Sequence, residues 1–75
     1  MEELVKSIAL SLVDNPDEVK VNTVTKDGET VVELRVAASD MGKVIGKQGR
    51  IAKAIRVVVK AAARDNKSVG VEIIQ

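Results

Sequence analysis

Two glycines, Gly46 and Gly49, stand in a strongly basic stretch of the chain, MGKVIGKQGRIAKAIR (41–56). This stretch holds three of the five glycines, five of the twelve basic residues and no acidic residue. Glycine permits a turn with positive φ, and without a Cβ its backbone can approach a ligand closely. A helix beginning at Arg50 would point its free N–H groups at the same spot, where Lys47 adds charge. These residues predict a site for a phosphodiester backbone.

The charge of the whole chain is segregated along its length. Residues 1–40 contain four basic and nine acidic residues, whereas residues 41–75 contain eight basic and two acidic residues. From Gly42 to Arg64 there are seven bases and no acid. A basic run is usually a solvated helix face, but such a face normally mixes both signs. The asymmetry therefore favours a surface for an anionic partner.

The composition argues against most catalytic chemistry. The 75 residues include no His, Cys, Phe, Tyr or Trp, which excludes thiol chemistry, zinc–thiolate sites and disulfides. The serines have no base beside them, and the carboxylates show no metal-ligand spacing. We expect a protein that is not an enzyme, needs no metal or cofactor, and folds as one domain (1–75) around an aliphatic core.

The sequence gives no sign of export or of membrane insertion. The N-terminal segment begins with acidic residues, and no small-residue cleavage site follows its apolar residues, unlike in a secretory signal. No apolar run approaches the ~18 residues that a membrane span needs. A cytoplasmic protein without a membrane partner is the expectation.

The first 36 residues predict a helix followed by a hairpin. Apolar residues recur at helical spacing over 2–13, and Asn15-Pro16 ends the pattern. Period-two alternation then surrounds Asp27-Gly28, a strong signal for a two-residue hairpin turn. If Lys26 and Glu29 close this turn, one face of the hairpin is buried and the other faces solvent. The predicted buried pairs are Val21 with Leu34, Thr23 with Val32 and Val19 with Val36; Val24 and Val31 are among the residues predicted to face solvent.

Two helices and a strand are predicted for the rest of the chain. Ser39 is a candidate N-cap for a short helix ending near Ile45, and a second helix should run over 50–64. The predicted buried stripe of this second helix consists of Ile51, Ala54, Ile55, Val58 and Ala62. The alternation in KSVGVEII then predicts a last strand. The order α-β-β-α-α-β predicts an α+β, two-layer sandwich, with a three-stranded mixed sheet and its helices on one face.

The stretch VIGKQG, between two short helices and after a hairpin, resembles the GxxG loop of the KH domain. The element order resembles the type II, bacterial form of this fold over essentially the whole chain. The run GKVIGKQGRIAKAIRVVVKAAA is most similar to the small single-domain bacterial KH proteins of the KhpA type. One position departs from the family pattern, because Ala52 stands where many KH domains have a larger aliphatic residue.

The resemblance implies a cytoplasmic protein that binds single-stranded RNA, since KH loops clamp about four backbone nucleotides. It also implies a homodimer, or a heterodimer with a larger KH-domain protein of the KhpB (Jag/EloR) type. A role as a post-transcriptional regulator or RNA chaperone, linked to cell division, cell shape and envelope growth, is part of the same expectation. The predicted RNA-binding residues are Lys43, Val44, Ile45, Gly46, Lys47, Gln48, Gly49, Arg50 and Lys53.

In this hypothesis RNA lies in a groove between the two middle helices and the sheet edge. Val44, Ile45 and Ile51 would form an aliphatic floor for the bases, although core packing is the other interpretation. No aromatic residue is available for base stacking, which is worth ~1–3 kcal/mol per base, so one domain should bind weakly. A two-fold dimer through the second middle helix, around Val57, would compensate through avidity.

Two alternatives to RNA binding remain open at this stage. The chain could be an adaptor that works mainly through a protein partner. It could also be a helix-turn-helix DNA-binding protein, since two helices joined by a glycine turn carry basic charge. The three predicted strands around those helices argue against this second alternative.

Overall fold

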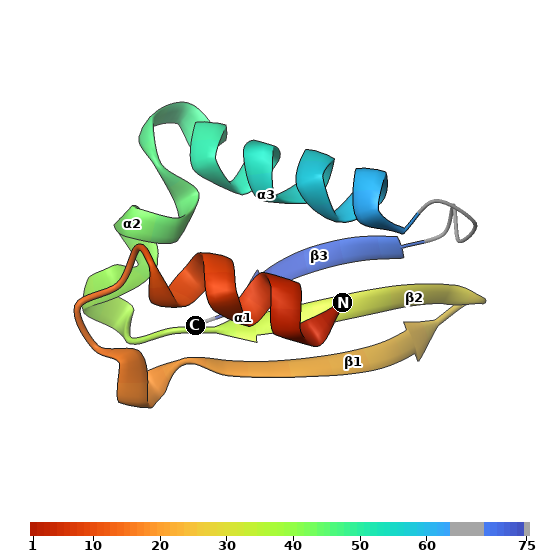
Figure 1. Cartoon of the computed structure of the whole chain (residues 1–75), viewed down its shortest axis with the longest axis horizontal. Coiled ribbons are helices and arrows are strands. Elements are labelled where there is room, and N and C mark those ends of the chain that lie inside the picture. The colour runs from red at the N-terminus through yellow and green to blue at the C-terminus, as the bar shows by residue number, and fades with distance from the viewer. Residues whose placement is uncertain (64–68, 75) are drawn as a thin grey trace.

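A computed structural model of the chain describes residues 1–63 and 69–74. Six main elements follow one another, with short 3-10 turns between some of them (Figure 1). All three helices lie on one face of a three-stranded sheet of order β1-β2-β3 (Figure 1). The prediction of an α+β fold with a mixed sheet is confirmed. The elements are α1 (Glu2–Leu10), β1 (Lys20–Lys26), β2 (Glu29–Arg35), α2 (Met41–Ile45), α3 (Arg50–Ala62) and β3 (Val69–Ile74).

The hairpin has the predicted register. Lys26 pairs with Glu29 across the turn, and β2 pairs antiparallel with β1 and parallel with β3. Asp27 and Gly28 both have positive φ, 51° and 79°, as the twist of a two-residue hairpin turn requires.

Two residues of the hairpin differ from their predicted exposure. Thr23 is exposed, because it lies on the outer strand, where its hydroxyl donates a hydrogen bond to a carboxylate oxygen of Glu2. Val31 is buried although it lies on the face without helices, because β2 is the central strand and its pairing partners Val24 and Gly70 flank it. Alternation therefore predicts the face correctly, whereas burial also depends on a strand's position in the sheet.

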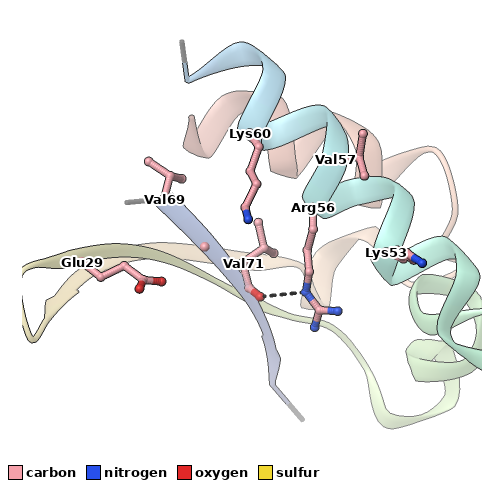
Figure 2. Close-up of a pocket in the computed structure, with 8 residues that line it drawn as sticks. Glu29, Lys53, Arg56, Val57, Lys60, Val69 and Val71 are labelled. Atoms are coloured by element: carbon pink, nitrogen blue, oxygen red, sulfur yellow. Dashed lines mark hydrogen bonds between the residues drawn. The ribbon is translucent and has the colours of Figure 1, made fainter. Parts of the chain in front are cut away.

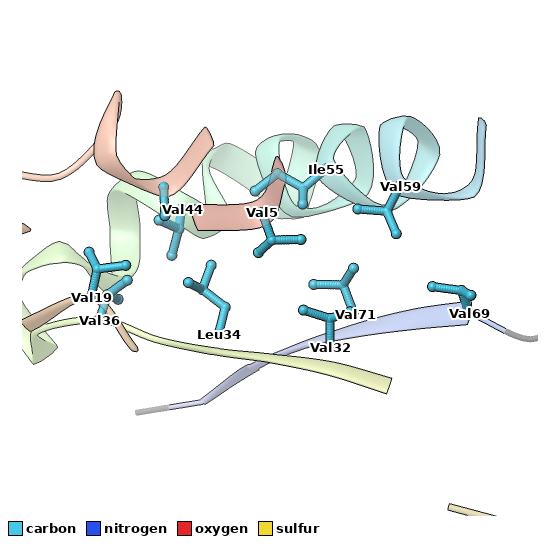
Figure 3. Close-up of a cluster of buried hydrophobic side chains, with 11 residues drawn as sticks. Val5, Val19, Val32, Leu34, Val36, Val44, Ile55, Val59, Val69 and Val71 are labelled. Carbon is cyan, nitrogen blue, oxygen red and sulfur yellow. The ribbon is translucent and has the colours of Figure 1, made fainter. Parts of the chain in front are cut away.

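The core fills the space between the helices and the sheet (Figure 3). Its middle is formed by Leu34 and Val32 of β2 against Val5 of α1 and Val59 of α3, all with no exposed surface. No aromatic residue is involved, so the hydrophobic packing between the layers is entirely aliphatic. The core residues are Val5, Ala9, Val19, Val32, Leu34, Val36, Val44, Ile55, Val59, Val69 and Val71.

The buried stripe of α3 is narrower than predicted and rotated around the helix. Ala52, Ile55 and Val59 face the sheet, whereas Ala54 and Ala62 are exposed and Val58 keeps 44% of its surface exposed. Because the apolar face of α3 is wider than its contact with the sheet, part of it borders α1 or solvent. A wide apolar stripe identifies the helix but does not tell which of its residues the sheet covers.

The ends of the helices also differ in detail from the prediction. The regular part of α1 ends at Leu10, three residues early, and Pro16 opens a 3-10 turn. Asp40, not Ser39, is the residue before α2, and its side chain does not cap that helix. The predicted end of α3 at Arg64 lies outside the described residues. Among residues 1–63 and 69–74, no helix is long and apolar enough to cross a membrane.

Candidate nucleic-acid interface

The segment between α2 and α3 is a tight loop built on positive φ angles. Gly46 has φ 77° and ψ 175°, Gln48 has φ 58° and Gly49 has φ 74°. The loop is closed by a hydrogen bond of 3.2 Å from the Gly49 N–H to the Gly46 carbonyl. The side chains of Lys47 and Gln48, between the two glycines, are exposed. The loop therefore projects from the surface, with α3 starting directly behind it.

Gly46 is required by its contact with Ile51 as well as by its backbone angles. A Cβ at this position would lie 2.6 Å from Cγ1 and 2.9 Å from Cβ of Ile51, whereas a Cβ at Gly49 would meet nothing within 4 Å. The loop is thus packed directly against the first turn of α3. This close packing fixes the spacing between the loop and the start of the helix.

Three of the predicted cationic residues lie around the loop with their charges unpaired among the described residues. Lys47 is in the loop, and Arg50 and Lys53 are exposed on the first turns of α3. Arg50 donates a hydrogen bond of 3.4 Å from Nη2 to the neutral side-chain oxygen of Gln48. The loop, the N-terminus of α3 and these side chains together form an electropositive surface.

Lys43 differs from these three cations because it already has acidic partners. Its Nζ lies 3.1 Å from an oxygen of Asp14 and 3.7 Å from an oxygen of Asp40. The hydrogen bond with Asp14, and then its charge, raise the pKa of Lys43. A phosphate would have to compete with two carboxylates for this ammonium group. Lys43 therefore connects α2 to the segment after α1, which is a structural role that its position in the sequence did not reveal.

Asp40 is the centre of this connection. Its carboxylate is fully buried and accepts hydrogen bonds from the backbone N–H groups of Asp14 (3.1 Å) and Asn15 (3.0 Å) and from the Asn15 side chain. Burial alone raises the pKa of Asp40, but these hydrogen bonds and the charge of Lys43 outweigh it, so the pKa lies below its ordinary value. The start of α2, and with it the loop, is fixed to residues 25 or 26 positions earlier in the chain.

A groove of about 460 Å³ runs between α3 and the outer edge of β3 (Figure 2). From α3, Arg56 and Lys60 extend toward the strand, and Nε of Arg56 donates a hydrogen bond of 3.4 Å to the Val71 carbonyl (Figure 2). Lys53 was among the predicted RNA-binding residues and Arg56 and Lys60 were not, although both belong to the run of seven bases between Gly42 and Arg64. The lining residues are Glu29, Lys53, Arg56, Val57, Lys60, Val69, Gly70 and Val71.

The predicted aliphatic floor for bases needs correction. Val44 has no exposed surface, so it belongs to the core and cannot contact a base. Ile51 is half-buried and lines a different groove, between α1 and α3. Of the three floor residues, Ile45, with 36% of its surface exposed, is accessible beside the loop. Of the valines that line the α3–β3 groove, Val57 is exposed, whereas Val69 and Val71 are buried and belong to the core.

The groove between α1 and α3 has a different character. Its volume is about 410 Å³, and it is lined almost entirely by aliphatic side chains, with Arg50 at one end. Val58 lies in it, and the neighbouring Val57 keeps 61% of its surface exposed. Besides Arg50 the lining residues are Leu4, Ile8, Leu12, Ile51, Ala54, Ile55 and Val58.

The sequence matches the family described as "KhpA/KhpB, KH domain" over residues 2–73. The chain belongs to this KH-domain family. A protein of Clostridium acetobutylicum named "RNA-binding protein KhpA" is 64% identical over 75 residues, which cover 99% of this chain and all of the relative. Proteins of the same name from Borreliella burgdorferi and Listeria monocytogenes are 51% and 47% identical, covering 96% and 100% of this chain and 89% and 100% of their own.

Membership of this family confirms the predicted resemblance. The family and these relatives are named for a KH domain and for RNA binding, not for a catalytic activity, which agrees with the prediction that the chain is not an enzyme. No solved structure matches the chain.

Proposed function

We propose that the chain binds single-stranded RNA through the loop from Gly46 to Gly49 and the groove between α3 and β3. The observation that carries this proposal is the loop: two glycines at positive φ present exposed Lys47 and Gln48 directly before the N-terminus of α3. Backbone N–H groups and a helix N-terminus favour a phosphate there. The names of the relatives, RNA-binding protein KhpA, support the same ligand.

In the proposed mechanism, the loop holds the RNA backbone while the groove receives the bases. Lys47, Arg50 and Lys53 neutralise phosphates next to the loop, which releases counterions and makes binding depend on salt. Unstacked bases of a single strand then lie between exposed Val57 of α3 and the backbone of β3 at Val71. Lys43 supports the site by fixing α2 to the segment after α1.

The same proposal includes a second copy of the chain or a KhpB-type partner. No aromatic side chain is present for base stacking, and a single groove therefore binds weakly. Two linked sites would raise the effective affinity without new contacts to RNA. The apolar α1–α3 groove with exposed Val58 is the surface that we assign to this association, whereas Val57 lines the α3–β3 groove.

The association surface can be tested by sedimentation. Val58→Glu should dissociate a homodimer, because it places a charge in an apolar groove, whereas Ser7→Glu on the exposed side of α1 serves as the matched control. The repulsion between basic α3 helices should also make the wild-type dimer tighter at high salt. A Val58→Glu protein that associates like the wild type would place the interface elsewhere.

The resemblance supports a cytoplasmic role as a post-transcriptional regulator or RNA chaperone, linked to cell division and envelope growth. In the adaptor alternative, a protein partner binds the same α1–α3 groove, and the chain does not bind RNA. The helix-turn-helix alternative has less support, because Arg56 and Lys60 of α3 extend toward β3 (Figure 2). A recognition helix would instead present such side chains to the major groove of DNA.

The experiment that tests RNA binding changes the loop and leaves the fold intact. Lys47→Asp with Gln48→Asp replaces one cationic and one neutral side chain with two anionic ones. Both positions are exposed, so the circular dichroism spectrum should stay unchanged. Fluorescence anisotropy with a labelled single-stranded RNA should show binding by the wild type and none by this variant. Equal binding by both proteins would remove the loop from the site, and no binding by either would favour the adaptor.

A further inference from the structure

Among the residues that the structure describes, Glu29 is the one acidic residue that lines the groove between α3 and β3 (Figure 2). It is the first residue of β2, and its side chain extends toward β3 from the side opposite to Lys60 (Figure 2). Three cationic side chains, Lys53, Arg56 and Lys60, line the same groove. A carboxylate weakens the attraction of this groove for phosphate, so its presence calls for a different role.

The carboxylate reaches the groove because residue 70 has no side chain. One carboxylate oxygen of Glu29 lies 2.9 Å from the position that a Cβ of Gly70 would occupy. Gly70 sits between Val69 and Val71, whose side chains point into the core. The bare backbone at Gly70 thus leaves the space in which the acid lies.

Within residues 1–63 and 69–74, the Glu29 carboxylate accepts no hydrogen bond and forms no ion pair. The other acids near this part of the sheet are different: Glu33 and Glu72 both pair with Lys26, at 3.7 and 3.2 Å. Glu29 is exposed, so its charge remains solvated in the absence of a ligand. Both of its oxygens are therefore available as acceptors at the strand side of the groove.

A carboxylate accepts hydrogen bonds and cannot donate them when ionised. Among the RNA bases, cytosine, adenine and guanine carry an exocyclic amino group, whereas uracil carries only carbonyl oxygens at the corresponding positions. Glutamate and aspartate accept from the N4 amino group of cytosine in direct readout. A uracil at the same place would bring its O4 against the carboxylate. Two hydrogen-bond acceptors would then oppose each other without a proton between them, which is unfavourable.

We propose that Glu29 is a specificity-determining residue, which accepts a hydrogen bond from the exocyclic amino group of a base in the α3–β3 groove and disfavours uracil there. This inference rests on the proposed RNA binding and deepens it. Phosphate contacts at the loop position the strand and carry no sequence information. Recognition of the base is therefore assigned to Glu29, which lies across the groove from the cationic side chains of α3.

The experiment compares octacytidylate with octauridylate, two pyrimidine strands that differ mainly at the 4-position. Wild-type protein should bind octacytidylate about tenfold more tightly, as expected for one charge-assisted hydrogen bond. Glu29→Ala should bring this ratio close to one. Glu72→Ala is the matched control, because it removes an equal charge from the neighbouring strand outside the groove; it should tighten both strands alike and keep the ratio.

Gly70→Ala perturbs the same carboxylate without removing it. The new Cβ would come within 2.9 Å of the Glu29 oxygen, and the flexible side chain would have to move out of the groove. This variant should therefore reduce the cytosine preference while Glu29 remains in the chain. Equal wild-type binding of the two strands, or a preference that survives Glu29→Ala, would overturn the role of Glu29 and leave RNA binding standing. Failure of both strands to bind would overturn RNA binding itself.

Discussion

Gly46→Ala tests the packing that connects the loop to α3. The backbone at this position, with φ 77° and ψ 175°, belongs to a region open essentially to glycine, and an alanine there costs about 1–3 kcal/mol. The added Cβ would also lie 2.6 Å from Cγ1 of Ile51, and overpacking of this kind costs typically another ~1–3 kcal/mol. The sum is about 2–6 kcal/mol, against a total stability of about 4–11 kcal/mol for a domain of this length.

Gly49→Ala is the matched control in the same loop. It also has positive φ, 74°, but its Cβ would meet nothing within 4 Å, so only the left-handed conformation is penalised, by roughly 1–2 kcal/mol. Each kcal/mol lowers the melting temperature of a small domain by about 4–8 °C. Thermal unfolding followed by circular dichroism should therefore show a clearly larger loss for Gly46→Ala than for Gly49→Ala.

A double-mutant cycle identifies the atoms responsible. Ile51→Ala removes Cγ1 and Cδ1, two of the three atoms that the new Cβ of Gly46→Ala would approach. The double variant should therefore be more stable than the sum of the two single changes predicts, by more than the ~0.5 kcal/mol within which independent sites add. Additive effects, or equal losses for Gly46→Ala and Gly49→Ala, would refute the claim that Ile51 holds the loop against α3.

Two further predictions concern charges. Lys47→Ala should reduce the slope of log affinity against log salt by about 0.7, one phosphate contact on single-stranded RNA; Lys43→Ala should instead lower the melting temperature and leave this slope unchanged, because its ammonium is held by Asp14 and Asp40. If both variants reduced the slope equally, Lys43 would contact a phosphate of the RNA as Lys47 does. The lowered pKa of Asp40 means that its ionised form stabilises the fold above the ordinary pKa of about 4, and that this stabilisation is lost as the pH falls through the folded-state value. In thermal melts, the gap between wild type and Asp40→Asn should thus be widest near neutral pH and narrow below about pH 4; a constant gap would contradict the sign of the shift.

Local patterns predicted the elements that depend on neighbouring residues. The Asp27-Gly28 turn set the register of the hairpin, and the glycines of the loop marked the break between α2 and α3. The face of each strand followed from alternation, because the side-chain period of a strand is two. The candidate loop could therefore be located from the sequence alone.

The features that the sequence did not predict depend on residues far apart in the chain. Nothing local to Asp40 indicates that it binds the backbone of Asp14 and Asn15, and nothing local to Lys43 indicates that it pairs with Asp14. The same holds for Glu29, which enters the groove only because Gly70 lies beside it on the neighbouring strand. Such contacts depend on how the helices pack against the sheet, which local sequence patterns do not show. For the same reason, Val44 was predicted to contact bases although it lies in the core.

The most direct measurement of the central claim is a titration of the isotopically labelled protein with a short single-stranded RNA, followed by backbone amide chemical shifts. The loop amides from Gly46 to Gly49 and those of Val69 and Val71, at the outer edge of β3, should shift first and in parallel. The amides of α1 and β1, on the acidic side of the sequence, should stay in place. Shifts confined to α1, or a loop that does not respond while RNA is bound, would contradict the account.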